Sequence, residues 1–433
     1  MMTQELPALA NALAAIITRE YLLEDPAACA SYAIHGLVPG YVALPGSLDE
    51  LAAVLRVAQE YRAAVVPWGG GTQQNIGCPP DRIDLIVCTG RLNNVLIHEP
   101  DDLTISVEAG MTLGALRDKL ARHGQMLPLD PPHPARATIG GLIATATDGP
   151  RRLGYGTLRD LLIGVTVVEA SGRVSKGGGM VVKNVSGFDM MKLYLGSFGT
   201  LAVIASANFK LLPIARAAAS LLCMFDEPAS AFAALEALQL TQLTPTAAEY
   251  LNRGALARLE LAGACALALR SEGLPAAVER HMTDMATLAT RNGARATQRL
   301  DAAADIDLWA RIADLPQTDR LAADEALLKL STLPAELEQT LDQLEALATR
   351  AGQSVAINAR ALTGVLYARL RPVTAEALHS LHSALPAIQW IATTLPDAPR
   401  WGASPPGLDL MRRIKTEFDP LGLLNPGRFV IDV

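Results

Sequence analysis

The chain has 433 residues, of which 50% are hydrophobic and 19% are charged, so it can fill a large core. This length predicts two or three folded units. A formal net charge of −7 gives no basic excess for a phosphate backbone, which argues against a nucleic-acid partner. Five cysteines without a CxxC pair argue against a disulfide framework, a zinc ribbon or an iron–sulfur site, and they fit a reducing cytoplasm.

Residues 1–39 are expected to form an N-terminal helical extension. Glu5 precedes the first apolar stretch and no basic segment comes before it, which favours an amphipathic helix over a signal peptide. No run of about 18 apolar residues is present, so we expect no transmembrane helix. We expect a cytoplasmic protein whose membrane association, if any, depends on partner subunits.

From residue 40 to residue 213, strand and helix patterns alternate. Ser47, followed by Glu50, predicts the capped start of a helix over 47–62. A second helix is expected over 111–124, with Gly124 at its end. Strands are expected over 63–68, 81–88 and 103–110, a hairpin over 161–174 that turns at Ser171 and Gly172, and a strand pair over 200–213.

After about residue 215, long Ala/Leu-rich helical stretches dominate and glycine-rich turns become rare. We therefore expect a domain boundary near 213–218 and a separate, helix-rich domain over 216–400. Residues 401–433 combine one helix with two Pro/Gly turns and are expected to return to the first domain.

The strongest local motif is a run of three glycines that directly follows a buried strand. Glycines let the backbone turn sharply and leave no Cβ between the N–H groups and a diphosphate. No Lys-Ser/Thr pair follows, so the motif is not a P-loop, and no GxGxxG supports an ordinary dinucleotide fold. The alternative is a tight structural turn. The candidate phosphate-binding residues are Pro67, Trp68, Gly69, Gly70, Gly71, Thr72 and Gln73.

Three further segments could border a ligand. In 130–145, paired glycines next to small residues would let the chain press against a flat ring, although a glycine-kinked strand is the alternative. In 154–160, an adjacent Arg and Asp could orient a ligand's polar edge or form an exposed ion pair. In 183–201, a cation and an amide lie near glycine turns and could stabilise negative charge, or could be plain surface. The candidates in these segments are Pro132, Thr138, Gly140, Gly141, Ala144, Gly156, Arg159, Asp160, Lys183, Asn184, Gly199 and Thr200.

In this order, the four segments resemble the FAD-binding domain of the vanillyl-alcohol-oxidase family, also named after p-cresol methylhydroxylase. Within that family, residues 154–201 are most similar to the E subunit of bacterial glycolate oxidase, and residues 418–428 resemble the family's C-terminal return. The resemblance covers 40–213 and 410–428. It implies an α+β fold: a two-lobed FAD-binding domain (about 40–145 and 146–213) and a helix-rich α+β cap over a sheet (216–400). It also implies that FAD binds to the candidates above, together with Ile204 and Asn425.

Departures from the family pattern refine this picture. Members with covalent flavin carry His at the position of Thr72, so the resemblance implies noncovalent FAD. The family's GTLGVI segment has Ala202 in place of its second glycine, which enlarges one side chain at the cofactor pocket. The His-x-His metal pair of related D-lactate dehydrogenases is missing, so we expect no metal site.

Oxidation of a hydroxy acid requires a base. By its position after the turn at 130–132, His133 is the best candidate, and the alternative is a structural histidine. No other catalytic residue is assigned from the sequence.

The resemblance implies one of two functions. In the first, the chain is an FAD-binding subunit of a glycolate oxidase or dehydrogenase complex that oxidises a small 2-hydroxy acid, glycolate to glyoxylate. Its partners would then be a homologous FAD-binding catalytic subunit and an iron–sulfur subunit. In the second, it is a stand-alone FAD-dependent 2-hydroxy-acid dehydrogenase of the D-lactate type, with its own active site.

Overall fold

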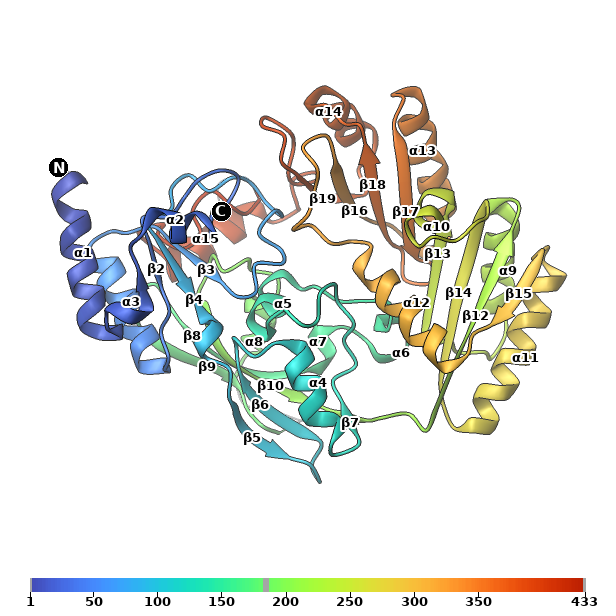
Figure 1. The fold of residues 1–433 in the computed structure, drawn as a ribbon, viewed down its shortest axis with the longest axis horizontal. Coiled ribbons are helices and arrows are strands. Elements are labelled where there is room, and N and C mark those ends of the chain that lie inside the picture. Colours follow the sequence, from blue (N-terminus) through green and yellow to red (C-terminus); the bar gives the residue numbers. More distant parts are fainter. Residues whose placement is uncertain (1, 182–186, 431–433) are drawn as a thin grey trace.

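The computed structural model describes residues 2–181 and 187–430 (Figure 1). Two sheets lie in the first half of the chain, and one large sheet is built from residues 217–393. The expected α+β fold is confirmed.

The first sheet has the order β1-β2-β4-β3, made of β1 (Leu22–Leu23), β2 (Tyr41–Ala43), β4 (Leu85–Cys88) and β3 (Val65–Trp68). Two helices, α1 (Met2–Ile17) and α3 (Leu48–Glu60), pack their apolar side chains against it. The predicted cap of α3 is confirmed, because the Ser47 hydroxyl accepts a hydrogen bond from the Glu50 N–H at 3.1 Å.

The second sheet is antiparallel, with the order β5 (Val95–Glu99), β6 (Thr104–Glu108), β10 (Val203–Lys210), β8 (Leu162–Val168) and β9 (Val174–Gly178). Two helices, α4 (Leu113–Ala121) and α5 (Ile139–Thr145), share its core. The predicted hairpin is confirmed, and Gly172 in its turn has a φ of 77°.

The sheets divide between β4 and β5, earlier in the chain than the lobe boundary expected near residue 145. The reason is a long-range pairing of β6 with β10, in which Val107 lies opposite Ala207 and both side chains are fully buried. A local sequence pattern identifies strands but carries no information about such partners.

Short elements connect these layers. They are η1 (Arg19–Tyr21), α2 (Pro26–Ala30), η2 (Thr89–Arg91), β7 (Gln125–Met126) paired with β11 (Leu212–Pro213), α6 (Arg152–Tyr155), α7 (Leu158–Leu161) and α8 (Met191–Tyr194).

The large sheet is antiparallel throughout and one of its faces is apolar. Its order is β15 (Ala296–Arg299), β12 (Ala217–Phe225), β14 (Cys265–Gly273), β13 (Ala247–Asn252), β17 (Ser354–Arg360), β18 (Val365–Arg371), β16 (Ala326–Ser331) and β19 (Ile388–Thr393). The apolar face is covered by α9 (Pro228–Gln239), α11 (Pro275–Arg291), α13 (Leu337–Arg350) and α14 (Ala375–Ala384), with η3 (Pro334–Glu336) before α13.

The opposite face of the large sheet is partly polar and meets the first half of the chain. Helices α10 (Arg253–Arg258) and α12 (Ala302–Asp314) cover one end of it, and Figure 1 shows α12 on the side toward the first two sheets. Over β16, β18 and β19, this face packs against Ile76, Phe198 and Trp401. Its buried polar side chains include Glu249 and Arg360.

The tail returns to the first sheet through α15 (Leu408–Phe418). The Val65 N–H donates to the Leu423 carbonyl, and the Asn425 N–H donates to the Val65 carbonyl, both at 2.7 Å. Residues 423–425 therefore extend the edge of the first sheet beside β3, next to the glycine run.

Candidate cofactor and active site

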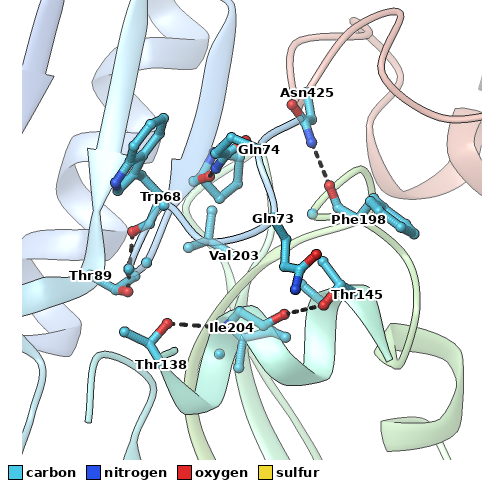
Figure 2. A pocket seen from close by; sticks show the side chains of 18 of the residues that line it. Trp68, Gln73, Gln74, Thr89, Thr138, Thr145, Phe198, Val203, Ile204 and Asn425 are labelled. Atoms are coloured by element: carbon cyan, nitrogen blue, oxygen red, sulfur yellow. Dashed lines mark hydrogen bonds between the residues drawn. The ribbon is translucent and has the colours of Figure 1, made fainter. Parts of the chain in front are cut away.

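A groove of about 740 Å3 lies where the first two sheets and the tail meet. Figure 2 shows its lining side chains, with Trp68 and Thr89 on one wall and Val203 and Ile204 on another. The structure brings together 14 of the sequence-predicted residues there: Pro67, Trp68, Gly69, Gly70, Gly71, Thr72, Gln73, Thr138, Gly140, Gly141, Ala144, Gly199, Ile204 and Asn425. Ala202, expected at the cofactor pocket as a departure from the family pattern, lines the groove too, and six further lining residues were not predicted: Gln74, Thr89, Thr145, Phe198, Val203 and Arg428.

The glycine run follows β3 and packs directly on the second glycine-containing segment. A Cβ on Gly70 would lie 1.8 Å from the Arg136 carbonyl oxygen, and a Cβ on Gly69 would lie 2.1 Å from the Thr138 hydroxyl. Gly71 has a φ of 69°, a conformation that other residues rarely adopt. Glycine is thus required here because the glycine run and the segment 136–138 lie in close contact. The approach of a diphosphate would be a second reason for glycine at these positions.

Two tail residues complete the groove. Asn425 donates its side-chain N–H to the Phe198 carbonyl (Figure 2), while its Oδ1 is buried without a partner among the described residues. Arg428 donates to the carbonyls of Gln74, Ile76 and Cys78 at 2.8–2.9 Å. Burial lowers the pKa of Arg428 to about 10, which leaves it cationic at neutral pH. Arg428 is also the one charged side chain among the described residues that line the groove.

This groove fits FAD. Glycine backbone and one buried cation suit a diphosphate, and the unpartnered Oδ1 of Asn425 suits a hydroxyl donor, of which FAD carries several.

Several other predicted site residues have local roles. The Asp160 carboxylate accepts hydrogen bonds from the Thr157 N–H and hydroxyl at 2.8 and 2.9 Å and so caps α7, while Gly156 precedes this cap with a φ of 80°. Arg159 is exposed. Thr200 donates to the Ser197 carbonyl at 2.7 Å within a turn. None of these residues lines the groove, and their place beside the cofactor stays a prediction. Lys183 and Asn184 lie outside the described residues.

His133 lies in a contact between the two halves of the chain. Its ring Nε2 is 2.9 Å from an Asp319 carboxylate oxygen, and its backbone N–H donates to the Asp314 carboxylate at 2.8 Å. Asp319 also pairs with Arg136 at 2.6 Å. In the same segment, the buried Thr318 donates its hydroxyl to the Thr72 carbonyl at 3.0 Å. The geometry ties the segment 314–319 to the glycine run and gives His133 a structural partner.

A second cavity, of about 320 Å3, adjoins the groove. It shares Gln73 and Thr145 with the groove, and Figure 2 shows these two side chains close together. Its other lining residues are Ile76, Pro132, Thr147, Pro316, Lys329, Tyr367 and Trp390. Pro132 was predicted as a cofactor residue, whereas the three residues from the large sheet were missed.

Buried ion pairs fasten the large sheet to the segment 148–152. Arg360 donates to the side chain of Asp148 and, at 2.9 Å, to its carbonyl. Its Nε lies 3.8 Å from the fully buried Glu249. Burial raises the pKa of Glu249 to about 7, and it raises the pKa of nearby Asp130 to about 6. Arg360 therefore lies among carboxylates that depend on its positive charge.

Comparison with known proteins agrees with this geometry. Residues 39–178 match the model of the FAD binding domain, and residues 400–429 match that of the C-terminal domain of FAD linked oxidases. The glycolate oxidase subunit GlcD of Bacillus subtilis (strain 168) is 26% identical over 423 residues, covering 90% of this chain and 89% of that protein. The glycolate oxidase subunit GlcE of Escherichia coli (strain K12) is 38% identical over 128 residues, covering 29% of this chain and 37% of that protein.

Two similarities extend this comparison. A D-lactate dehydrogenase of Archaeoglobus fulgidus is 37% identical over 174 residues, covering 40% of this chain and 38% of that protein. The solved structure of p-cresol methylhydroxylase with substrate bound superposes with a TM-score of 0.80 at 15% identity, covering 99% of this chain and 97% of that one. The second likeness concerns the fold alone.

The chain thus carries an FAD binding domain and the C-terminal segment of FAD linked oxidases, it is an FAD-dependent oxidoreductase, and its fold is like that of p-cresol methylhydroxylase. The family resemblance inferred from the sequence is confirmed, and so is FAD as the cofactor. More particularly, the chain is similar to both the D and the E subunits of glycolate oxidases. Among the described residues, no helix combines the length and apolar character needed to cross a membrane.

Proposed function

We propose that this chain is an FAD-binding subunit of a glycolate oxidase-type complex and that it takes part in the oxidation of a small 2-hydroxy acid. The similarity to the glycolate oxidase subunit GlcD, which runs along 90% of the chain, carries this proposal. The local similarity to GlcE supports membership of a complex that contains more than one such subunit.

Oxidation of a 2-hydroxy acid to a 2-oxo acid removes a hydride from the carbinol carbon and a proton from the hydroxyl group. FAD supplies the two-electron acceptor. In this chain the glycine run, Asn425 and Arg428 would hold the cofactor in the groove. The adjoining cavity beside Gln73 and Thr145 would hold the substrate and exclude bulk water from it.

FAD is held noncovalently in this proposal, because Thr72 cannot form the histidyl bond of covalent relatives. The Thr72 side chain is buried and its carbonyl accepts the bond from Thr318. Acid precipitation of the purified protein is expected to release all yellow colour into the supernatant. Flavin that stays with the washed, denatured pellet would contradict this expectation.

Activity is expected to depend on partner subunits. Electrons taken from a hydroxy acid must be passed on, and no group of three or more His, Cys, Asp or Glu side chains in the described part of the chain could hold a metal ion. The chain purified alone should bind FAD yet reduce an artificial dye with glycolate only slowly. Co-expression with a homologous flavin subunit and an iron–sulfur subunit should give a stable complex with full activity.

The second candidate is a stand-alone 2-hydroxy-acid dehydrogenase, which the cavity beside the groove and the similarity to D-lactate dehydrogenases favour. Rapid and complete anaerobic bleaching of the lone chain by glycolate or D-lactate, at the rate of the complex, would establish this candidate and overturn the dependence on partners.

A further inference from the structure

We propose that the cavity beside the groove is a carboxylate pocket in which the ammonium group of Lys329 pairs with the acid group of a small substrate. This inference names the substrate class of the site and rests on FAD being bound in the adjoining groove. It extends the proposed function, because it assigns substrate recognition to this chain's own cap domain.

The first observation is a row of side chains across three paired strands. In the strand register, Lys329 of β16 lies opposite Tyr367 of β18 on one side and opposite Trp390 of β19 on the other. Directly paired residues in an antiparallel sheet point to the same face, so these three side chains stand together. All three line the cavity.

The second observation is that Lys329 has no anionic partner. Three arginines on the same buried face are each paired with buried acids: Arg270 with Asp305 at 3.1 Å, Arg360 with Asp148, and Arg369 with Glu325 at 2.9 Å. Lys329 is half-buried, and its ammonium group forms no hydrogen bond or ion pair with any residue that the structure describes.

Among the described residues that line the cavity there is no carboxylate, and Lys329 is the one charged side chain. A half-buried ammonium group without a counter-ion has lost part of its hydration and gains most from an anion that arrives from outside. Since the neighbouring arginines already have their acids, that anion must come from a ligand.

The remaining walls set the size and polarity of the ligand. The rings of Tyr367 and Trp390 are 5% and 8% exposed and close one side of the cavity. On the other side are the hydroxyls of Thr145 and Thr147, 2.7 Å apart, and the amide of Gln73. These walls leave room for a small ligand only, and the hydroxyl and amide groups can hydrogen-bond to the 2-hydroxyl group of a small acid.

The test uses the full FAD-loaded chain and oxalate, a small dianion that the site cannot oxidise. Oxalate should perturb the flavin absorbance spectrum in a saturable way, because the cavity and the groove share Gln73 and Thr145. Lys329→Gln should weaken this binding about tenfold or more, and Lys329→Arg should largely restore it, because a buried charge pair loses most when one partner becomes neutral.

The matched control is Lys176→Gln, which neutralises an exposed lysine of β9 and should leave the oxalate titration unchanged. Neutral ethylene glycol should give no saturable change with any variant. Each variant must keep stoichiometric FAD and the wild-type melting temperature, which shows that it is folded.

Oxalate affinity that is the same in Lys329→Gln and wild type would overturn the pocket, and so would the lack of any saturable perturbation in an FAD-loaded wild-type chain. Either result would leave FAD binding and the proposed subunit function intact. Failure of the wild-type chain to bind FAD would instead refute the proposed function.

Discussion

Replacing Gly70 with valine is expected to abolish FAD retention completely. A Cβ at this position would lie 1.8 Å from the Arg136 carbonyl oxygen and 2.7 Å from its carbonyl carbon, and backbone atoms cannot move aside as a flexible side chain can. The glycine run would have to move away from the segment 136–138, and this movement would deform the groove. The measurement is the ratio of flavin to protein absorbance in the purified variant.

Gly179→Val is the matched control, because a Cβ on Gly179 would meet no atom of the described residues within 4 Å and its φ is not in the left-handed range. That variant should retain FAD at the wild-type ratio. Circular dichroism should show that both variants are folded. A folded Gly70→Val protein with stoichiometric FAD would show that the close contact of the two segments is not needed for the cofactor.

Replacing Arg360 with methionine should lower the free energy of unfolding by about 3–5 kcal/mol, the usual cost of removing one partner from a buried ion pair. Arg360 is 3% exposed, and its loss leaves Asp148 and Glu249 buried without their cation. Urea denaturation at neutral pH measures this difference. Arg371→Met is the control: its pair with Asp324 is largely exposed, so its effect should stay below about 1 kcal/mol.

The cost of Arg360→Met should also depend on pH. A buried carboxyl group whose pKa is raised stabilises the fold fully below its ordinary pKa, and this stabilisation is lost as the pH rises through the folded value. For Glu249 that value is about 7 even with Arg360 present, and removing the arginine raises it further. The difference in free energy of unfolding between the variant and the wild type should therefore be smaller at pH 5 than at pH 8. An equal difference at both pH values would contradict this account.

The sequence alone predicts those features whose cause is local. Ser47 and Glu50 lie three positions apart, and they cap α3 as expected. The three glycines follow a short buried strand and line the groove. Such features depend on neighbouring residues, so hydrophobic periodicity and capping preferences are enough to locate them.

The cavity was missed because its residues come together only through strand order. Lys329, Tyr367 and Trp390 are ordinary strand residues in the sequence, and no spacing rule connects them. In the segment 154–160, a local contact offers a second explanation of the sequence pattern. Its Arg-Asp pair suggested a ligand contact, but Asp160 is used to cap α7, a local role that competes with binding.

The return of the tail to β3 affects the order of events during protein synthesis. Arg428 and its acceptor Gln74 are 354 positions apart, and residues 423–425 form the sheet edge beside the glycine run. At about 5–20 residues per second, a ribosome completes the glycine run roughly 20–70 s before the tail that supports it. Until then, β3 lacks the backbone hydrogen bonds that Val65 forms with residues 423–425. We therefore expect FAD to be retained only after residues 423–428 have been synthesised and have joined the groove.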